Sequence, residues 1–176
     1  MPPIARASRP AAKRPERPRS RPALAIALRV DGGEWPSQPV LRRIARAALD
    51  AAVALTPFDF APQAEVSLVF TDDTAVRRLN ARYGGKDSPT NVLSFPGDAG
   101  EAPLGPMLGD IVFAAETVRR EAAAAGLTVR DHLSHLLVHG FLHLVGYDHE
   151  DDGEAALMEG LETAILARLG IADPYA

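Results

Sequence analysis

Three histidines near the C-terminal end of the chain have the spacing of ligands to one metal ion. His139 and His143 are four residues apart, so on a helix they share one face about 6 Å apart along the axis. Gly146 follows three residues later, where a glycine can end the helix and turn the chain sharply. His149 can then reach the same ion. Three protein ligands leave the fourth tetrahedral position for water, which is typical of a catalytic zinc site.

The residue after the first histidine restricts the chemistry. The same histidine spacing, with a glycine at the same place, occurs in a class of zinc proteases. Those proteases carry a glutamate directly after the first histidine as general base, and here that residue is Gly140. The pattern therefore predicts zinc and argues against ordinary peptide hydrolysis. Asp148, beside His149, is a candidate to accept a proton or orient a histidine; capping or solvating the turn is an equally good interpretation.

Two further histidines lie in the same segment. His135 is four residues before His139, so it shares that helix face and is an alternative ligand. A core histidine, or a hydrogen-bond donor that supports the ligands, is the more common role for such a residue. His132 is interpreted in the same way, with less reason to be a ligand.

Hydrophobic periodicity and turn residues predict nine elements around this segment. Apolar alternation and short apolar runs predict strands at residues 23–30, 65–70, 91–95 and 107–114. Apolar residues at helical spacing predict helices at residues 40–55, 72–83, 116–125, 128–144 and 154–169. Asp72 is an expected N-cap, and Gly126 an expected C-terminal cap. Thr128 or Asp131 is expected to open the fourth helix. The fold class is therefore α+β (mixed α/β), a small sheet of about four strands packed with about five helices and a three-histidine metal site at the end of a helix.

The last predicted helix should pack through one apolar stripe, formed by Leu157, Leu161, Ile165 and Leu169.

Charge and composition separate a tail from a folded body. Residues 1–22 contain six prolines and carry a net charge of +6. Because the whole chain has a net charge of −4, the remaining residues carry −10. Such a basic Pro/Arg-rich segment cannot bury enough apolar surface to fold, so residues 1–22 are expected to be disordered. An inert extension and an RNA-attracting arm are equally good interpretations, and a transit peptide is a weaker one. Residues 23–172 are expected to form a single metallohydrolase-like domain.

The absence of cysteine excludes disulfides, thiolate ligands and a cysteine nucleophile, and it fits a reducing compartment. No apolar run is long enough for a membrane span or a secretory signal. A cytoplasmic protein is therefore expected.

Three sequence blocks resemble a known family. The string HGFLHLVGYDH, residues 139–149, resembles the signature of the YbeY endoribonuclease family of bacterial ribosomal-RNA maturation factors. Two blocks agree with it: Leu79-Asn80 with residues 86–96 (KDSPTNVLSFP), and residues 108–111 (LGDI). The resemblance covers roughly residues 65–165, and the histidine block is its most specific part.

The resemblance implies a small mixed α/β fold that holds one zinc ion at His139, His143 and His149. It implies cleavage of single-stranded RNA in 3′-end maturation of 16S rRNA, with a role in ribosome quality control. The implied partners are single-stranded RNA, precursor 16S rRNA and the small ribosomal subunit with its associated proteins. A ribosome-associated GTPase is a further candidate partner.

The chain departs from the family at one position. The family's arginine after the tyrosine of the central motif is replaced by Gly84, which follows Tyr83. Either the role of that arginine is reduced in this chain, or Arg82 or Lys86 covers it from nearby by placing positive charge near the RNA backbone. A solvated helix face is the alternative interpretation for Arg82.

Arg78 and Ser94 are candidates for substrate binding. The alternative interpretations are a solvated helix face for Arg78 and a bond within its own strand for Ser94. The catalytic candidates are Arg82, Lys86 and Asp148. Two other functions are weighed against the ribonuclease. One is a zinc peptidase or other small metallohydrolase, and the other is a non-catalytic ribosome assembly factor.

Overall fold

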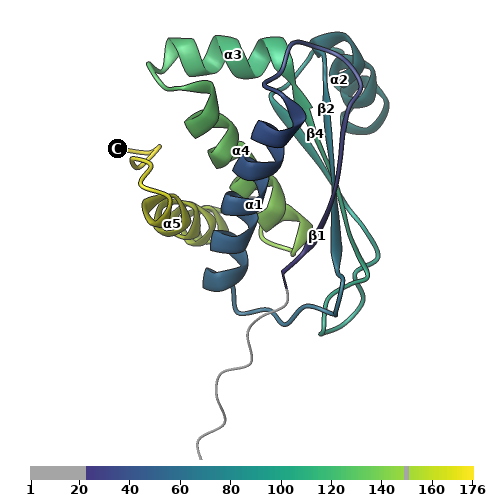
Figure 1. Cartoon of the computed structure of the whole chain (residues 1–176), viewed down its shortest axis with the longest axis vertical. Coiled ribbons are helices and arrows are strands. Elements are labelled where there is room, and N and C mark those ends of the chain that lie inside the picture. Colours follow the sequence, from purple (N-terminus) through teal and green to yellow (C-terminus); the bar gives the residue numbers. More distant parts are fainter. Residues whose placement is uncertain (1–22, 149–150) are drawn as a thin grey trace, which may run out of the picture.

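A four-stranded sheet with helices on both faces forms the body of the molecule (Figure 1). The computed structural model describes residues 23–148 and 151–176. The predicted tail, residues 1–22, and the predicted ligand His149 lie outside the described residues. The fold class is the predicted α+β class, because the strands and helices follow one another in the predicted order.

The strands are β1 (Ala25–Val30), β2 (Glu65–Thr71), β3 (Val92–Pro96) and β4 (Met107–Ala114). Their order in the sheet is β1-β2-β4-β3. The β1-β2 and β2-β4 pairs are parallel, whereas β3 runs antiparallel to β4 and forms one edge of the sheet. The edge strand β3 is the strand that carries the predicted substrate-binding residue Ser94.

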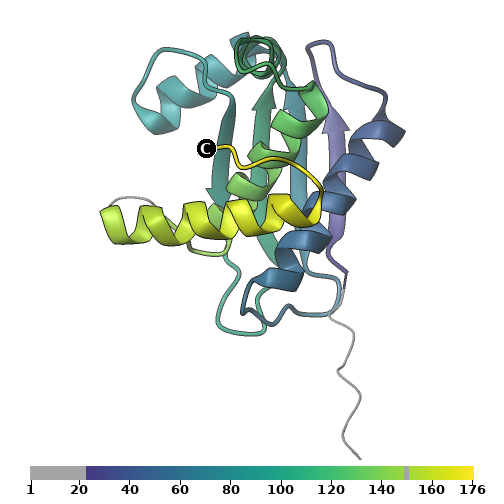
Figure 2. The same cartoon turned by 90° about the vertical axis from the view of Figure 1, so that its left-hand side faces the viewer.

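Three helices lie on one side of this sheet, two packed directly on the strands and the last crossing over those two (Figure 2). They are α1 (Gln38–Leu55), α4 (Val129–Leu144) and α5 (Asp152–Arg168). The main core lies between them and the inward side chains of the strands, which include Leu68, Phe70, Ile111 and Phe113. Apolar residues surround most of α4, because it packs against the sheet, α1 and α5 at once. This central position fixes the helix that carries all the predicted metal-binding histidines except His149.

The opposite face of the sheet carries a smaller apolar cluster. Helix α2 (Asp73–Leu79) continues into a single π-helical turn, η1 (Asn80–Gly84). Val76 of α2 packs with Val69 and Val112 of the sheet. Helix α3 (Ala115–Ala124) follows β4 directly and leads into α4. The helix predicted for residues 72–83 is therefore present, but its last turn widens into the π form.

The predicted helix ends are confirmed where a side chain or a glycine specifies them. Asp72 caps α2 by accepting a hydrogen bond from Ala75 N at 2.8 Å, and Thr128 caps α4 through Asp131 N at 3.0 Å. Gly126 follows α3 with a positive φ of 66°.

The stripe predicted for α5 is wrong at its first position. Leu157 is 58% exposed, whereas Met158, Glu162, Ile165 and Leu166 are buried. Leu161 and Leu169 pack only at the margin of the core. The buried face of α5 includes the carboxylate of Glu162, which an apolar pattern cannot reveal. Within residues 23–148 and 151–176, none of the helices has the length and apolar character that crossing a membrane requires.

Candidate metal centre

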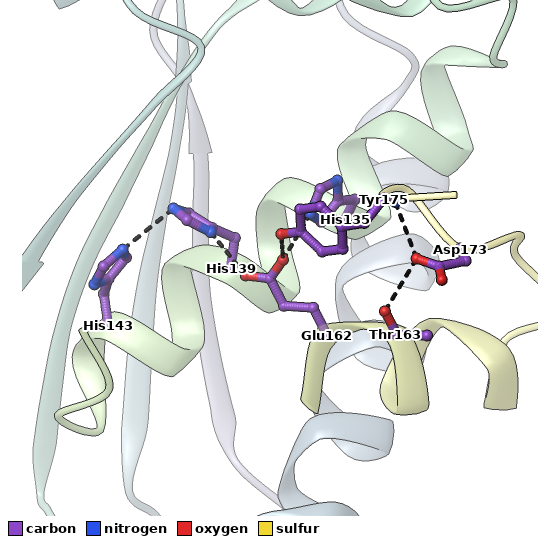
Figure 3. A network of polar contacts seen from close by, with 7 residues as sticks. All are labelled: His135, His139, His143, Glu162, Thr163, Asp173 and Tyr175. Carbon is purple, nitrogen blue, oxygen red and sulfur yellow. Dashed lines mark hydrogen bonds and ion pairs between the residues drawn. The ribbon is translucent and has the colours of Figure 1, made fainter. Parts of the chain in front are cut away.

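Two of the predicted ligands face each other at the C-terminal end of α4 (Figure 3). The Nε2 atoms of His139 and His143 are 3.2 Å apart, and the two rings are nearly perpendicular, at 81°. Two imidazole nitrogens bound tetrahedrally to one zinc at about 2.0 to 2.1 Å would lie about 3.3 Å apart. The separation therefore fits two ligands of one ion.

The other ring nitrogen of each histidine has an oxygen acceptor. His139 Nδ1 lies 2.8 Å from Glu162 Oε1, and His143 Nδ1 lies 3.0 Å from the carbonyl oxygen of Tyr147. A carbonyl and an ionised carboxylate only accept hydrogen bonds, so each Nδ1 carries a proton. In a neutral ring, Nε2 then presents the lone pair. Two lone pairs directed at each other repel unless a cation lies between them. This donor set thus fits zinc, which binds neutral imidazole nitrogen.

Glu162 is a buried carboxylate with three hydrogen-bond donors. Its Oε2 accepts from His135 Nε2 at 2.8 Å and from the hydroxyl of Tyr175, while its Oε1 accepts from His139. Burial raises the pKa of Glu162, but the hydrogen bonds from His135, His139 and Tyr175 outweigh it and lower the pKa to about 2. The carboxylate is therefore ionised at neutral pH and can only accept.

The turn after α4 supports His143 directly. The N–H groups of Gly146 and Tyr147 donate to the carbonyls of His143 and Leu142, at 3.1 and 3.0 Å. These two bonds close a Schellman motif, and the positive φ of 94° at Gly146 makes it possible. The sequence predicted this glycine-dependent turn, and the structure confirms it. The motif returns the Tyr147 carbonyl to His143 and sends the chain toward His149.

A cleft of about 510 Å³ opens beside the two histidines. One wall is the edge strand β3, with Ser94 among its lining residues, and the other is the end of α4 with the turn after it. Asp148 also lines this cleft. The structure therefore brings together His139, His143, Ser94 and Asp148. Within the described ranges, no three His, Asp or Glu side chains form a metal cluster, and His149 falls in the gap between those ranges.

Gly140 occupies the sequence position at which the zinc proteases carry their general base. A Cβ built at this glycine would lie 2.8 Å from Ile111 Cγ2 and 3.1 Å from Ser94 Oγ. Because the backbone of α4 approaches the sheet this closely, residue 140 faces β3 and β4. The missing carboxylate is thus a consequence of helix–sheet packing.

The remaining histidines have carboxylate partners. His135 donates to Glu162, and His132 Nε2 lies 2.9 Å from Glu121 Oε2 on α3. These are the supporting roles that the sequence favoured over metal binding. Glu162 itself was missed, although its sequence position carried a signal: it is the one charged residue in line with Met158, Ile165 and Leu166 on the buried face of α5.

The basic candidates lie outside the histidine cleft. Arg78 and Arg82 line a separate hollow over α2 and η1, and Lys86 follows in the loop before β3. A Cβ at Gly84 would lie 2.3 Å from Asn80 Oδ1, and the buried Asn80 holds the loop through a 2.8 Å bond to the Ser88 carbonyl. A side chain at position 84 would therefore require the side chain of Asn80 to shift.

Comparison with known proteins identifies the family. The profile described as "Endoribonuclease YbeY" matches residues 35–170. This chain belongs to the YbeY endoribonuclease family. A YbeY endoribonuclease of Sinorhizobium fredii is 53% identical over 162 residues, covering 87% of this chain and 92% of the relative. One of Rhizobium meliloti is 53% identical over 161 residues, covering 87% and 95%.

A solved structure supports the fold. The solution structure of TM1509 from Thermotoga maritima superposes with a TM-score of 0.50 at 20% sequence identity, over 86% of this chain and 99% of that protein. At that identity the likeness concerns the fold alone. The family resemblance noted in the sequence is thus confirmed by close relatives, and the mixed sheet with five α-helices is the expected YbeY architecture.

Proposed function

We propose that this chain is a zinc-dependent endoribonuclease that cleaves single-stranded RNA, matures the 3′ end of 16S rRNA and takes part in ribosome quality control. The supporting observation is the His139–His143 pair, with both Nε2 atoms 3.2 Å apart and both Nδ1 atoms bonded to oxygen. Membership of the YbeY family supports the ribonuclease activity. His149 completes the proposed ligand set.

The residues of the cleft divide the work of phosphodiester hydrolysis. Zinc bound by the three histidines supplies Lewis-acid chemistry, activating a water and polarising a phosphoryl oxygen. His139 and His143 hold their Nε2 atoms in place because both Nδ1 protons are donated. Asp148 and Ser94 both line the cleft. In this proposal Asp148 exchanges a proton with the attacking water or the leaving oxygen, and Ser94 Oγ binds a phosphate oxygen from the β3 wall.

Positive charge for the RNA backbone comes from the α2–η1 surface. Arg78 and Arg82 are exposed there, and Arg82 lies 5.2 Å from the centre of the exposed Tyr83 ring. A guanidinium beside an aromatic ring suits a flexible single strand, which binds through its phosphates and by base stacking. With Lys86 in the following loop, we assign these side chains to RNA positioning at a distance from the bond that breaks.

This assignment predicts a salt-dependent effect. Arg82→Ala should weaken binding of single-stranded RNA irrespective of sequence and lower the slope of log affinity against log salt by about 0.7, the value for one phosphate contact. Arg43→Ala, which removes an exposed arginine of α1, is the matched control and should change neither. RNA affinity measured at several salt concentrations checks this, and an Arg82→Ala variant with unchanged affinity and slope would remove Arg82 from the RNA path.

The two other functions are less well supported. A zinc peptidase needs a general base, and the packing of Gly140 leaves no room for one at the usual position. A non-catalytic assembly factor would use zinc only to join α4 to the following turn. That function does not account for the open cleft beside the histidines.

The decisive substrate is precursor 16S rRNA, free and within small ribosomal subunits. The zinc-loaded wild type should shorten the 3′ end of this RNA, and His143→Ala should not. His132→Gln is the control and should retain cleavage, because His132 lies on the same helix but is bonded to Glu121. Cleavage of a peptide mixture in place of RNA would favour the peptidase. Zinc binding and normal subunit assembly without any RNA cleavage would favour the assembly factor.

A further inference from the structure

A polar network on the far side of His139 connects this ligand to the end of the chain (Figure 3). Glu162, whose side chain is only 1% exposed, joins His139 on α4 to Tyr175 near the C-terminus. Its Oε1 accepts from His139 Nδ1, and its Oε2 accepts from His135 and from the Tyr175 hydroxyl. The carboxylate thus divides its two oxygens unequally, with one donor on the ligand side and two on the other side.

The segment after α5 is itself fixed in place. Asp173 Oδ1 accepts from Thr163 Oγ1 at 3.1 Å and from the backbone N–H of Tyr175 at 2.9 Å. The Tyr175 ring then lies edge-on to His135, with ring centres 5.9 Å apart. These contacts fold residues 173–175 back onto α5, so that the hydroxyl of Tyr175 reaches Glu162.

We propose that Glu162 is the positioning residue of the metal site, and that Tyr175 and His135 hold its carboxylate so that the C-terminal segment sets how tightly the site binds metal. The inference rests on the proposed metal site. A buried carboxylate keeps one orientation only when its oxygens are bonded, and here all three bonds leave Oε1 facing His139. With Oε1 as acceptor, the His139 proton stays on Nδ1 and its Nε2 remains available for zinc.

Glu162→Gln tests whether the carboxylate keeps the proton of His139 on Nδ1. The oxygen of the amide replaces the carboxylate oxygen that receives two donors, so its NH₂ group turns toward His139 Nδ1. An NH₂ group cannot accept a hydrogen bond, so His139 must move its own proton to Nε2, the atom that should bind zinc. Zinc affinity should therefore fall about 10- to 100-fold, as for loss of a group that supports a ligand.

Two variants separate this effect from general damage. Tyr175→Phe keeps the ring against His135 and removes only the hydroxyl donor, so it should weaken zinc binding less than Glu162→Gln does. Glu101→Gln removes the same charge from an exposed position in the loop between β3 and β4 and should leave zinc binding unchanged.

The experiment has two measurements on the full chain. The first is the zinc dissociation constant of the wild type and the three variants, obtained by competition with a chelator. The second is the tautomer of His139, read from ¹⁵N NMR of the metal-free protein at about pH 8, where an ordinary imidazole is neutral. The wild type should carry the proton on Nδ1, and Glu162→Gln should carry it on Nε2.

The outcomes separate failure of the positioning role of Glu162 from failure of the proposed function. Wild-type zinc affinity and an Nδ1 proton in Glu162→Gln would overturn the proposal. If Glu162→Gln does not fold, Tyr175→Phe decides, and unchanged affinity in that variant removes the C-terminal segment from the site. If the wild type binds no zinc, the proposed function fails, whereas the tautomer measurement still tests whether Glu162 positions His139.

Discussion

Gly140 shows how one residue limits the chemistry of a metal site. It stands directly after His139, where a glutamate would supply a general base for peptide hydrolysis. Its Cα faces Ile111 and Ser94 at distances that leave no room for a side chain. The close contact that holds α4 on the sheet therefore also removes the protease base from the cleft.

Replacement by alanine should expose this constraint. Gly140→Ala should unfold at a free energy about 1 to 3 kcal/mol below that of Gly160→Ala, because an added methyl group overpacks a core at about that cost. Gly160 is the matched control, since it is also helical and has nothing within 4 Å of its Cβ position. Gly160→Ala should gain up to about 1 kcal/mol from helix propensity. Chemical denaturation measures both, and equal stabilities would show that α4 does not press on the sheet at this point.

At the residue scale, the spacing of the histidines predicted that His139 and His143 lie together. The same spacing gave no information about Glu162. His139 and His143 are separated by one helical turn, so their proximity follows from local structure. Glu162 comes from another helix, 23 residues from His139 along the chain. Its role depends on how α5 packs on α4, and no local pattern encodes that packing.

The turn at the end of α4 is the element on which the site depends most. Gly146 permits the Schellman motif that aims the Tyr147 carbonyl at His143. Gly126 closes the same motif after α3, with N–H bonds from Gly126 and Leu127 to Ala123 and Ala122. Both glycines have positive φ, and neither has an atom within 4 Å of a Cβ position.

These two turns form a matched pair of tests. Gly146→Ala and Gly126→Ala should each lose about 1 to 3 kcal/mol of stability, the usual cost of a left-handed residue other than glycine. Only Gly146→Ala should also lose zinc affinity, by about tenfold or more, because its turn supports His143 and leads to His149. Thermal unfolding and zinc titration measure the two effects. Equal zinc affinity in both variants would separate the turn from the metal site.

At the element scale, prediction succeeded where a local signal existed. Asp72, Thr128 and Gly126 mark helix ends through their own hydrogen bonds or backbone conformation. The stripe on α5 failed at Leu157, because the buried face runs through Met158 and Glu162 and an apolar pattern does not include a carboxylate. The π turn at Asn80–Gly84 was also missed, since it depends on the Asn80 side chain reaching the Ser88 carbonyl across the loop.

The whole molecule explains why the site lies at one edge of the sheet. The edge strand β3, the central helix α4 and the crossing helix α5 meet there. They supply a cleft wall, two proposed metal ligands and the buried carboxylate, respectively (Figures 2 and 3). The alternation of strand and helix along the chain was enough to predict the fold class. The meeting of these three elements was not predictable, because it depends on strand order and helix crossing.

The central claim is that a metal ion held by His139, His143 and His149 drives cleavage of RNA. The most direct test is to add zinc stepwise to the metal-free protein and follow cleavage of a fluorescent single-stranded RNA, for the wild type and for His143→Ala. The account predicts that wild-type activity rises until about one equivalent of zinc is bound, since a three-histidine site holds one ion, and that His143→Ala stays inactive. Equal cleavage by the metal-free protein, or by His143→Ala, would contradict it.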